Sequence, residues 1–388
     1  MAKAKMAVVL GDYDIEVREY EIPKALPGSL VIKVEAACIC GSDNHYMHCG
    51  VSAPGAIGHE FAGHIVDIGE GAEKSIHCYG GELKLGDRIA VYPWITCGTC
   101  PSCMRFGNGV CIMCDDAFIY GDPRNHTPGI RNCDPETAPH FKGGFGEYVH
   151  IYPGTYVWKI PDEMPSKIAA LMDPTAVAMR AIEQAMTAMG GLHEGISTTT
   201  TALIIGAGPI GVIAGMILRH MGVERLLISD MNENKLKMAQ DICGADEIIN
   251  VGGLTTEERV AKVREMTNGG PDVVINCANH VSSSVEGLQM VGKLGTFVEV
   301  GNAMSLTGAK NVTIDLPRVV FERNATVTSV VANYPKTFDR AFRLLKRYKE
   351  IPFERLLTHP FYSLDDLLPT LKKMRDDDYL KGVLIFKD

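Results

Sequence analysis

The sequence lacks the clustered positive charge that nucleic-acid-binding proteins carry. Its 38 Lys and Arg residues are outnumbered by 47 Asp and Glu residues, so the formal net charge is −9. Because phosphate binding requires basic patches, we expect no nucleic-acid partner. The sequence also lacks low-complexity tracts and a strong internal repeat. With 46% hydrophobic and 22% charged residues, its composition is that of an ordinary globular protein.

No apolar run in the sequence is long enough to span a membrane. The longest, residues 202–218, is shorter than the roughly 20 residues that a span needs, and glycines and a proline interrupt it. This run indicates instead a buried strand, a turn and a helix. Residues 1–10 lack the apolar core and cleavage site of a secretory signal peptide. We therefore expect no membrane partner and a location in the cytoplasm.

The cysteine pattern does not fit a disulfide scaffold, because such scaffolds are short and secreted. The chain has 388 residues and 12 cysteines, several of them crowded into residues 97–111. That distribution favours metal ligation in a reducing compartment.

A chain of this length suits two domains, because a single hydrophobic core stops growing at about 250–300 residues. The first region, up to about residue 155, alternates as half-buried strands do, for example at 5–22 and 29–39. The tail predicts helices at 336–350 and 364–376 and a strand at 381–386. In the first region, the polar stretch 113–142 has little periodicity, so we predict a long loop that serves as a lid, an oligomer contact or a mobile segment.

Residues 200–331 change to short apolar strands that alternate with helical patterns. Such alternation indicates a parallel sheet with helices on both faces, and six strands predict a doubly wound α/β fold that binds a dinucleotide. The helices include 232–243 and 256–267. The predicted strands are 202–205, 225–229, 247–250, 272–277, 296–300 and 326–331.

The strongest single motif is the cysteine series Cys97, Cys100, Cys103 and Cys111. Four thiolates at this spacing can close a tetrahedron around Zn²⁺ and leave no open position, so the site would be structural. The alternatives are two disulfides, unpaired thiols or a nucleic-acid-binding zinc ribbon. The scarcity of basic residues nearby disfavours the ribbon.

A second candidate metal site combines Cys40 with His59, which stand in the segments CGSD and GHE. Thiolate and imidazole are ligands that zinc accepts, and a catalytic zinc keeps a position open for water or substrate. Two ligands are too few, so others must come from elsewhere. By spacing alone, both residues could equally be packing residues.

A glycine-rich turn follows the first strand of the α/β region and opens a helix. In this context GxGxxG predicts a dinucleotide site, because the glycines allow a tight turn, close approach of the pyrophosphate, and close packing of helix on strand. The helix N-terminus offers free N–H groups to the phosphates. A carboxylate at the end of the second strand can accept hydrogen bonds from the ribose diol, although it could also serve only as a neighbour of a helix cap. The residues of this expected NAD site are Gly206, Gly208, Pro209, Ile210, Gly211 and Asp230.

These motifs, in this order, resemble the zinc-containing medium-chain dehydrogenase/reductase superfamily, near sorbitol and threonine dehydrogenases. The resemblance covers nearly the whole chain and includes CGSDNHY, GHEFAG, CGTCPSCMRFGNGVC, AALMDPTAVAMRAI and GAGPIG. It implies a GroES-like, mostly β catalytic domain formed by 1–175 and 332–388, and a Rossmann domain formed by 176–331. It also implies an active site in the cleft between the two domains.

The resemblance assigns roles to individual residues. Cys40, His59 and Asp173 would bind the catalytic zinc, and Glu60 would be an alternating or supporting ligand. The sequence departs from the family at Asp173, where Cys or Glu is usual, so this shorter side chain would reach zinc directly or through water. Ser42 would start a proton relay and His45 would continue it or contact substrate. Without the resemblance, Ser42 would be read as a turn cap and His45 as a solvated loop residue.

The function implied is transfer of a hydride between NAD and a small secondary alcohol, polyol or hydroxy-amino compound, with two zinc ions per chain. We expect a homodimer or homotetramer, as in relatives, and NAD in preference to NADP. The segment 113–142 is longer than expected, and we predict that it borders the active site or a neighbouring subunit. The alternatives are a catalytically silent, zinc-stabilised nucleotide-binding sensor and a zinc-independent quinone or enoyl reductase of the same superfamily.

Overall fold

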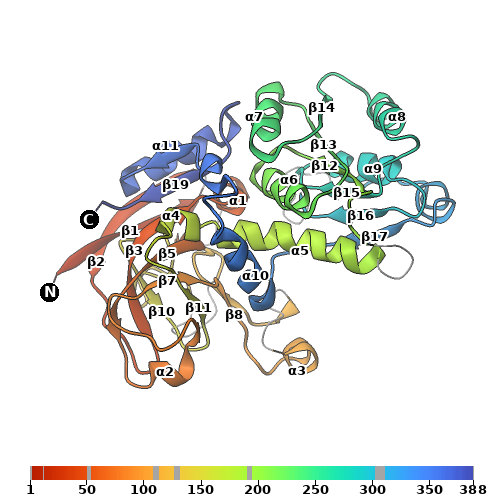
Figure 1. The fold of residues 1–388 in the computed structure, drawn as a ribbon. Coiled ribbons are helices and arrows are strands. Elements are labelled where there is room, and N and C mark those ends of the chain that lie inside the picture. The colour runs from red at the N-terminus through yellow and green to blue at the C-terminus, as the bar shows by residue number, and fades with distance from the viewer. Residues whose placement is uncertain are drawn as a thin grey trace. The chain divides into compact units, whose positions relative to one another are not determined.

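The computed structural model describes residues 2–11, 13–49, 54–107, 113–125, 132–189, 195–301 and 311–387. The chain forms two compact units (Figure 1). Unit 1 comprises Met1–Asp173 and Asn333–Asp388, and unit 2 comprises Pro174–Ala332. These boundaries lie close to those that the sequence suggested, at 175/176 and 331/332.

Unit 2 is a six-stranded sheet with the order β14-β13-β12-β15-β16-β17, in which every neighbouring pair is parallel. This is the order of a doubly wound dinucleotide-binding fold. All six predicted strands are therefore confirmed. Their bounds are β12 (Thr201–Ile205), β13 (Arg225–Asp230), β14 (Glu247–Asn250), β15 (Val273–Asn276), β16 (Thr296–Glu299) and β17 (Thr326–Ser329).

Among the described residues, four α-helices connect the strands from β12 to β16, and their ends follow from the sequence. They are α6 (Pro209–Met221), α7 (Glu233–Cys243), α8 (Thr256–Met266) and α9 (Val281–Met290). Asn232 caps α7 by accepting the Lys235 N–H at 3.0 Å, and Gly244 ends it in the left-handed region. Thr255 and Glu258 form a capping box at α8. Helices α6 and α7 pack together, as do α8 and α9, and the two pairs lie on opposite faces of the sheet (Figure 1).

Unit 1 is mostly β, and its described residues form three sheets. One has the order β2-β1-β4; the largest has the path β18-β19-β3-β5-β7-β11-β6, with β10 also paired to β3; and the smallest joins β8 to β9. The strands are β1 (Lys3–Gly11), β2 (Asp14–Glu21), β3 (Leu30–Cys38), β4 (Gly55–Ala56), β5 (Glu60–Ile68), β6 (His77–Tyr79), β7 (Arg88–Val91), β8 (Trp94–Ile95), β9 (Phe118–Ile119), β10 (Tyr148–Ile151), β11 (Tyr156–Lys159), β18 (His359–Phe361) and β19 (Gly382–Ile385).

Short helices surround these sheets. They are α1 (Gly41–Cys49), α2 (Ala72–Ser75), α3 (Pro101–Phe106), α4 (Ser166–Ala169), α10 (Pro335–Leu345) and α11 (Leu367–Lys372), and α5 (Met172–Met189) begins at the boundary of the unit. Single turns of other helix types lie at Pro317–Phe321 in unit 2 and at Phe353–Leu356, Leu364–Asp366 and Lys373–Arg375 in unit 1.

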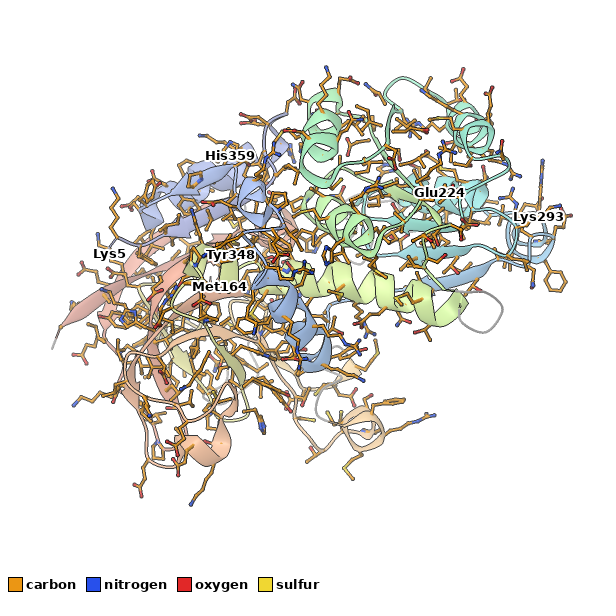
Figure 2. All side chains as sticks on the ribbon, viewed as in Figure 1. Lys5, Met164, Glu224, Lys293, Tyr348 and His359 are labelled. Carbon is orange, nitrogen blue, oxygen red and sulfur yellow. The ribbon has the colours of Figure 1, made fainter. Side chains whose placement is uncertain are left out.

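The C-terminal tail belongs to unit 1 because its strand β19 pairs antiparallel with β3. The Tyr348 hydroxyl also donates to the Glu163 carbonyl at 2.5 Å, and Figure 2 labels Tyr348 and the neighbouring Met164. The predicted strand at 381–386 is confirmed, and the helix predicted at 336–350 is present but ends at Leu345. The helix predicted at 364–376 is wrong in extent, because only Leu367–Lys372 is α-helical. Pro369, which has no backbone N–H to donate, lies inside it.

Several side chains of the segment 113–142 lie in the core of unit 1. Phe118, Tyr120 and Phe141 are buried, and so is the whole of Lys142. The Lys142 ammonium donates to the Asn132 side-chain oxygen and to the Asp134 carbonyl, both at 3.0 Å. The described backbone of the segment is mostly irregular, as predicted, with one two-residue strand at Phe118–Ile119.

The helices in the described part of the chain include none that is both long and apolar enough to cross a membrane.

Burial of Lys142 predicts a characteristic dependence of stability on pH. Burial lowers the pKa of Lys142 to about 8, below its ordinary value of 10.5. The unfolded chain therefore binds this proton more tightly than the folded protein, and the cost of burying the charge disappears as pH rises from about 8 to 10. We therefore expect the free energy of unfolding of the wild-type protein to rise over this pH range. Lys142→Met should not show this increase.

Denaturant unfolding gives the free energy of unfolding of wild type and of Lys142→Met at pH 7.5 and at pH 9.5. Subtracting the change with pH in the variant from the change in wild type isolates the contribution of Lys142, because groups that titrate equally in both proteins cancel. Identical pH dependence in wild type and variant would mean that Lys142 keeps an ordinary pKa.

Candidate functional site

Strand pairing in unit 1 brings together the residues of the candidate catalytic metal site. Cys40 stands between β3 and α1, and Glu60 is the first residue of β5, where it pairs with Cys38. His59 immediately precedes β5. As a result, the thiol of Cys40, the imidazole of His59 and the carboxylate of Glu60 present ligand atoms that all lie within 4.8 Å of one another.

A buried ion pair ties the third member of this group to the end of the chain. Because Val383 of β19 pairs with Cys38, which also pairs with Glu60, the side chain of Lys381, two residues before Val383, reaches Glu60 across the sheet. Its ammonium lies 2.9 and 2.7 Å from the two Glu60 oxygens, and both side chains are almost fully buried. Burial opposes the charge of Lys381, but Glu60 and Cys40 outweigh it and raise its pKa. The sequence reasoning missed Lys381, since nothing marks a single lysine before an apolar strand.

Asp43 supports the group from the first turn of α1. Its fully buried carboxylate accepts the Cys40 N–H at 2.8 Å, and its other oxygen lies 3.8 Å from His59 Nδ1. Burial raises the pKa of Asp43 to about 6, although His59 and the Cys40 N–H oppose the shift. The sequence reasoning quoted Asp43 within a motif but gave it no role. Its position suits it to orient both candidate ligands.

Asp173, the fourth expected ligand, lies nearby but outside the close group of ligand atoms. It sits in the first turn of α5, where its Oδ1 accepts a hydrogen bond from Asn333 Nδ2 at 3.0 Å. The Tyr92 hydroxyl donates to the Asn333 carbonyl at 2.8 Å and so anchors that partner. Burial raises the pKa of Asp173, His59 lowers it and Glu60 raises it further. Its ligation of zinc, directly or through water, stays a prediction.

The donor set and charge of this site fit zinc. Sulfur, imidazole nitrogen and carboxylate oxygen are the ligands that zinc takes in proteins, and three ligands leave a position for substrate. The acidic groups of Cys40, Asp43, Glu60 and Asp173 face the cation Lys381. Burial disfavours protonated His59, yet Cys40 and then Asp43 more than compensate and raise its pKa well above the ordinary value. A divalent cation would satisfy this excess of negative charge.

The two expected relay residues follow Cys40 on α1. The Ser42 hydroxyl is buried and has no hydrogen-bond partner among the described residues. It is therefore available to a ligand, which suits its predicted role. His45 is half-buried, with its ring 6.2 Å from that of Tyr46. The part of His45 in a relay stays a prediction.

The cysteine-rich segment gathers a second candidate metal site. The sulfurs of Cys97, Cys100 and Cys103 lie within 4.8 Å of one another and of Cys114 Sγ. Cys114 was not among the predicted ligands, and Cys111, which was, lies outside the described residues. The sequence offered a signal for Cys114 in the pair of cysteines at 111 and 114, three residues apart.

Backbone N–H groups point at these sulfurs. Cys97 Sγ accepts from the N–H of Thr99 at 3.4 Å and of Cys100 at 3.3 Å, and these bonds lower the pKa of Cys97 to about 6. Cys100 caps α3 by accepting the Cys103 N–H. Cys114 Sγ accepts the Cys97 N–H at 3.2 Å. The described cysteines are all free thiols, which disfavours the disulfide alternative and suits thiolate ligands.

The expected dinucleotide site of unit 2 has the required backbone. Gly206, at the end of β12, has φ 103°, and a Cβ there would lie 2.9 Å from the Ala278 nitrogen. A Cβ on Gly211 would lie 2.0 Å from the Gly206 carbonyl oxygen, so only glycine lets helix and turn pack this closely. Around Gly208 a Cβ would meet nothing within 4 Å, which leaves room for a ligand. Pro209 and Ile210 open α6.

Asp230 ends β13 beside this turn. One of its oxygens accepts the Ala207 N–H at 2.7 Å, and the other accepts the Asn232 N–H at 2.8 Å. These bonds fix the carboxylate next to the phosphate-binding turn, where a ribose would follow the pyrophosphate. The alternative of a mere cap neighbour is weakened, because Asn232 itself caps α7.

Comparison with known proteins identifies the family. Residues 26–162 match the family described as "Alcohol dehydrogenase GroES-like domain", and residues 209–347 match "Zinc-binding dehydrogenase". The chain belongs to the zinc-containing medium-chain dehydrogenase/reductase superfamily. The resemblance drawn from the sequence and the predicted fold class are thus confirmed.

Similar members of this superfamily span nearly the whole chain. It is 28% identical to L-threonine 3-dehydrogenase of Pyrococcus horikoshii over 97% of this chain and 96% of the relative. It is 28% identical to sorbitol dehydrogenase of Mus musculus over 91% of this chain and 88% of the relative.

Solved structures of alcohol dehydrogenases share the fold of this chain. An alcohol dehydrogenase of Thermotoga maritima superposes with a TM-score of 0.84 at 24% identity, over 100% of each chain. An Escherichia coli protein described as a short chain alcohol dehydrogenase, complexed with NADH, has a TM-score of 0.77 at 25% identity, over 99% of each chain.

The two candidate metal sites predict different consequences of losing a thiol. Cys100→Ser should remove one metal ion and several kcal/mol of stability, because a closed structural site contributes binding energy to folding. Cys40→Ser should remove the other ion with little effect on stability. Metal analysis and denaturant unfolding of the two variants measure both effects. A single ion in wild type, or equal destabilisation by both variants, would contradict separate roles.

The fourth ligand of the structural site can be identified in the same way. From the described geometry we expect Cys114→Ser to behave like Cys100→Ser. Cys111→Ser is the matched control, because it removes a neighbouring thiol. Cobalt–thiolate charge-transfer absorption of cobalt-substituted protein gives a second readout. Loss of metal from the Cys111 variant alone would restore the ligand set expected from the sequence.

Proposed function

We propose that this protein is a zinc-dependent dehydrogenase that transfers a hydride between NAD and a small secondary alcohol, polyol or hydroxy-amino compound. One observation carries the proposal: Cys40, His59 and Glu60 converge as an incomplete zinc donor set in a chain whose other unit has a dinucleotide-binding turn. An incomplete set leaves a coordination position for an alcohol oxygen.

The named relatives support the substrate class. They include L-threonine 3-dehydrogenase, sorbitol dehydrogenase and L-arabinitol 4-dehydrogenase. Their names describe oxidation of a hydroxyl group on a small, polar molecule. Zinc and NAD are the cofactors that the matched families and the NADH-bound relative support.

The chain's own residues suit the steps of alcohol oxidation. Zinc, when bound, would be held by Cys40, His59 and Glu60 or Asp173, and would polarise the alcohol oxygen and lower its pKa. The free hydroxyl of Ser42 would then accept the alcohol proton, and His45 would pass it outward. NAD⁺, when bound, would supply the hydride acceptor for the carbon that carries the hydroxyl, so the alcohol would lose two electrons and two hydrogens and become a carbonyl compound. Lys381 would hold Glu60 in place throughout.

Two other functions remain as alternatives, and specific observations disfavour each. A silent nucleotide-binding sensor would not need to keep the ligand group and the unpaired Ser42 hydroxyl together. A zinc-independent quinone or enoyl reductase would not need two clusters of metal-binding side chains.

The homo-oligomer and the location in the cytoplasm stay predictions. Support for self-association comes from β17, which is an edge strand of its sheet. Val327 on β17 has an exposed apolar side chain, and so do Leu316 and Phe321, which precede it in the sequence. An unpaired strand edge with apolar neighbours favours pairing with a second copy.

A screen of alcohols with NAD⁺, followed by the appearance of reduced nicotinamide, tests the proposed function. We expect Cys40→Ser and His59→Ala to lower kcat/KM by at least about 100-fold, since losing the metal removes several kcal/mol of stabilisation from the transition state. Cys78→Ser is the matched control, because Cys78 is a free thiol outside both candidate metal groups. Full activity of the Cys40 variant would exclude zinc-dependent oxidation at this site.

NAD should be preferred over NADP by at least about 10-fold in kcat/KM, because a hydrogen bond to Asp230 is lost and its carboxylate would meet the 2′-phosphate. The residues that follow, Met231 to Asn234, include no arginine or lysine to receive that phosphate. Asp230→Ala should narrow the preference, and kcat/KM for both cofactors with one alcohol measures it. Equal efficiency in wild type would mean that Asp230 does not bind the ribose.

A further inference from the structure

The face of α1 that carries Ser42 continues toward Tyr46. Residues four apart on a helix share a face, and one turn advances about 5.4 Å along the axis. Tyr46 is buried, with its hydroxyl 3.5 Å from an Arg124 nitrogen. Arg124 therefore contacts α1 at a residue one helical turn beyond Ser42, where the proton relay is predicted to start.

Arg124 is held above this tyrosine in a fixed orientation. Its guanidinium carbon lies 4.7 Å from the centre of the Tyr46 ring. Asp122, which is buried, accepts bonds from Arg124 Nε at 3.0 Å and from Nη2 at 2.8 Å, and also from the Arg124 N–H at 3.0 Å. Two parallel bonds and a ring contact leave the guanidinium little freedom.

The backbone around Asp122 is packed against the segment that leads to His59. A Cβ on Gly121 would lie 2.1 Å from the Gly58 carbonyl oxygen, and a Cβ on Gly55 would lie 2.6 Å from the Pro123 Cα. Gly58 is the residue before His59. The segment with Asp122 and Arg124 thus contacts both elements that supply candidate zinc ligands, α1 after Cys40 and the approach to β5.

Arg124 retains hydrogen-bonding capacity that the protein does not use. A guanidinium has five N–H donors, and Nη1 has no partner in the part of the chain that the structure describes. About half of the side chain is exposed, at 49%. The charge of Asp122 offsets that of Arg124, so the pair attracts an anion weakly. A neutral hydroxyl oxygen can accept from Nη1 without requiring net positive charge.

We infer that Arg124 determines substrate specificity by donating a hydrogen bond to a hydroxyl group of a neutral polyol, remote from the carbon that is oxidised. This inference rests on the proposed function and narrows its substrate class from alcohols in general to polyols. Asp122 and Tyr46 act as positioning residues for Arg124. A monohydric alcohol lacks the second hydroxyl and gains nothing from Arg124.

The experiment compares sorbitol and xylitol with butan-2-ol as substrates of the zinc-loaded enzyme with NAD⁺. We expect Arg124→Ala to lower kcat/KM for the polyols about 10–100-fold, because a charged hydrogen bond is lost, and to change the value for butan-2-ol less than about threefold. The loss should come mainly from a higher KM, since the bond exists in the bound substrate as well as in the transition state. Arg124→Lys, which lacks the planar fork, should recover only part of it.

Arg18→Ala is the matched control, because Arg18 pairs with Glu136 of the same segment from β2 and is not in contact with Tyr46. It should leave both substrate classes unchanged. Equal losses for polyols and butan-2-ol in the Arg124 variant would overturn the inference by showing a structural role. A larger loss for a hydroxy acid than for the neutral polyols would also overturn it, in favour of an anionic substrate.

Failure of the proposed function is distinguishable from failure of this inference. If wild type oxidises no alcohol, the proposed function fails, and calorimetric titration of xylitol into zinc-loaded wild type and Arg124→Ala decides the inference. Weaker binding to the variant supports it, and equal binding or no binding to either protein overturns it.

Discussion

The candidate metal site depends on the buried ion pair between Lys381 and Glu60. A carboxylate buried beside other acidic groups would be unfavourable without a cation, and removing one partner of such a pair commonly costs about 3–5 kcal/mol. The pairing of β19 with β3 and of β3 with β5 sets the distance between the two side chains. One sheet therefore brings Glu60 and its counter-ion Lys381 close to Cys40. Asp43, on α1, accepts a hydrogen bond from the Cys40 N–H.

Local pattern made much of the fold predictable from the sequence. The strands of unit 2 are short apolar runs between clear caps, as Asn232 and Thr255 show, so their positions could be predicted almost to the residue. The backbone of 113–142 has no such period, and only the structure shows that its described aromatic side chains are in the core. At 364–376 an apolar pattern suggested one helix, but Pro369 has no N–H to bond to the Asp365 carbonyl, so the α-helix begins only at Leu367.

In the candidate site, too, the residues that could be predicted are those that stand in local sequence motifs. Cys40, His59 and the glycine-rich turn stand in contiguous motifs, so their chemistry could be inferred from neighbours in sequence. Lys381 and Asn333 contact the site from the far end of the chain, and no spacing rule connects them to Glu60 or Asp173. Cys114 illustrates a further limit. Either Cys111 or Cys114 could be the fourth ligand of the structural site, and spacing in the sequence does not decide between them.

The strand order of unit 1 also constrains how the protein can be made. β19 and Lys381 are synthesised after all of unit 2, yet they complete the sheet around Cys40 and Glu60. Domains generally fold as units and N-terminal ones first during synthesis. Here unit 2, whose residues lie between the two parts of unit 1, can fold on the ribosome while the candidate zinc site still lacks its counter-ion. Of the two units, the one whose synthesis begins first is therefore completed second.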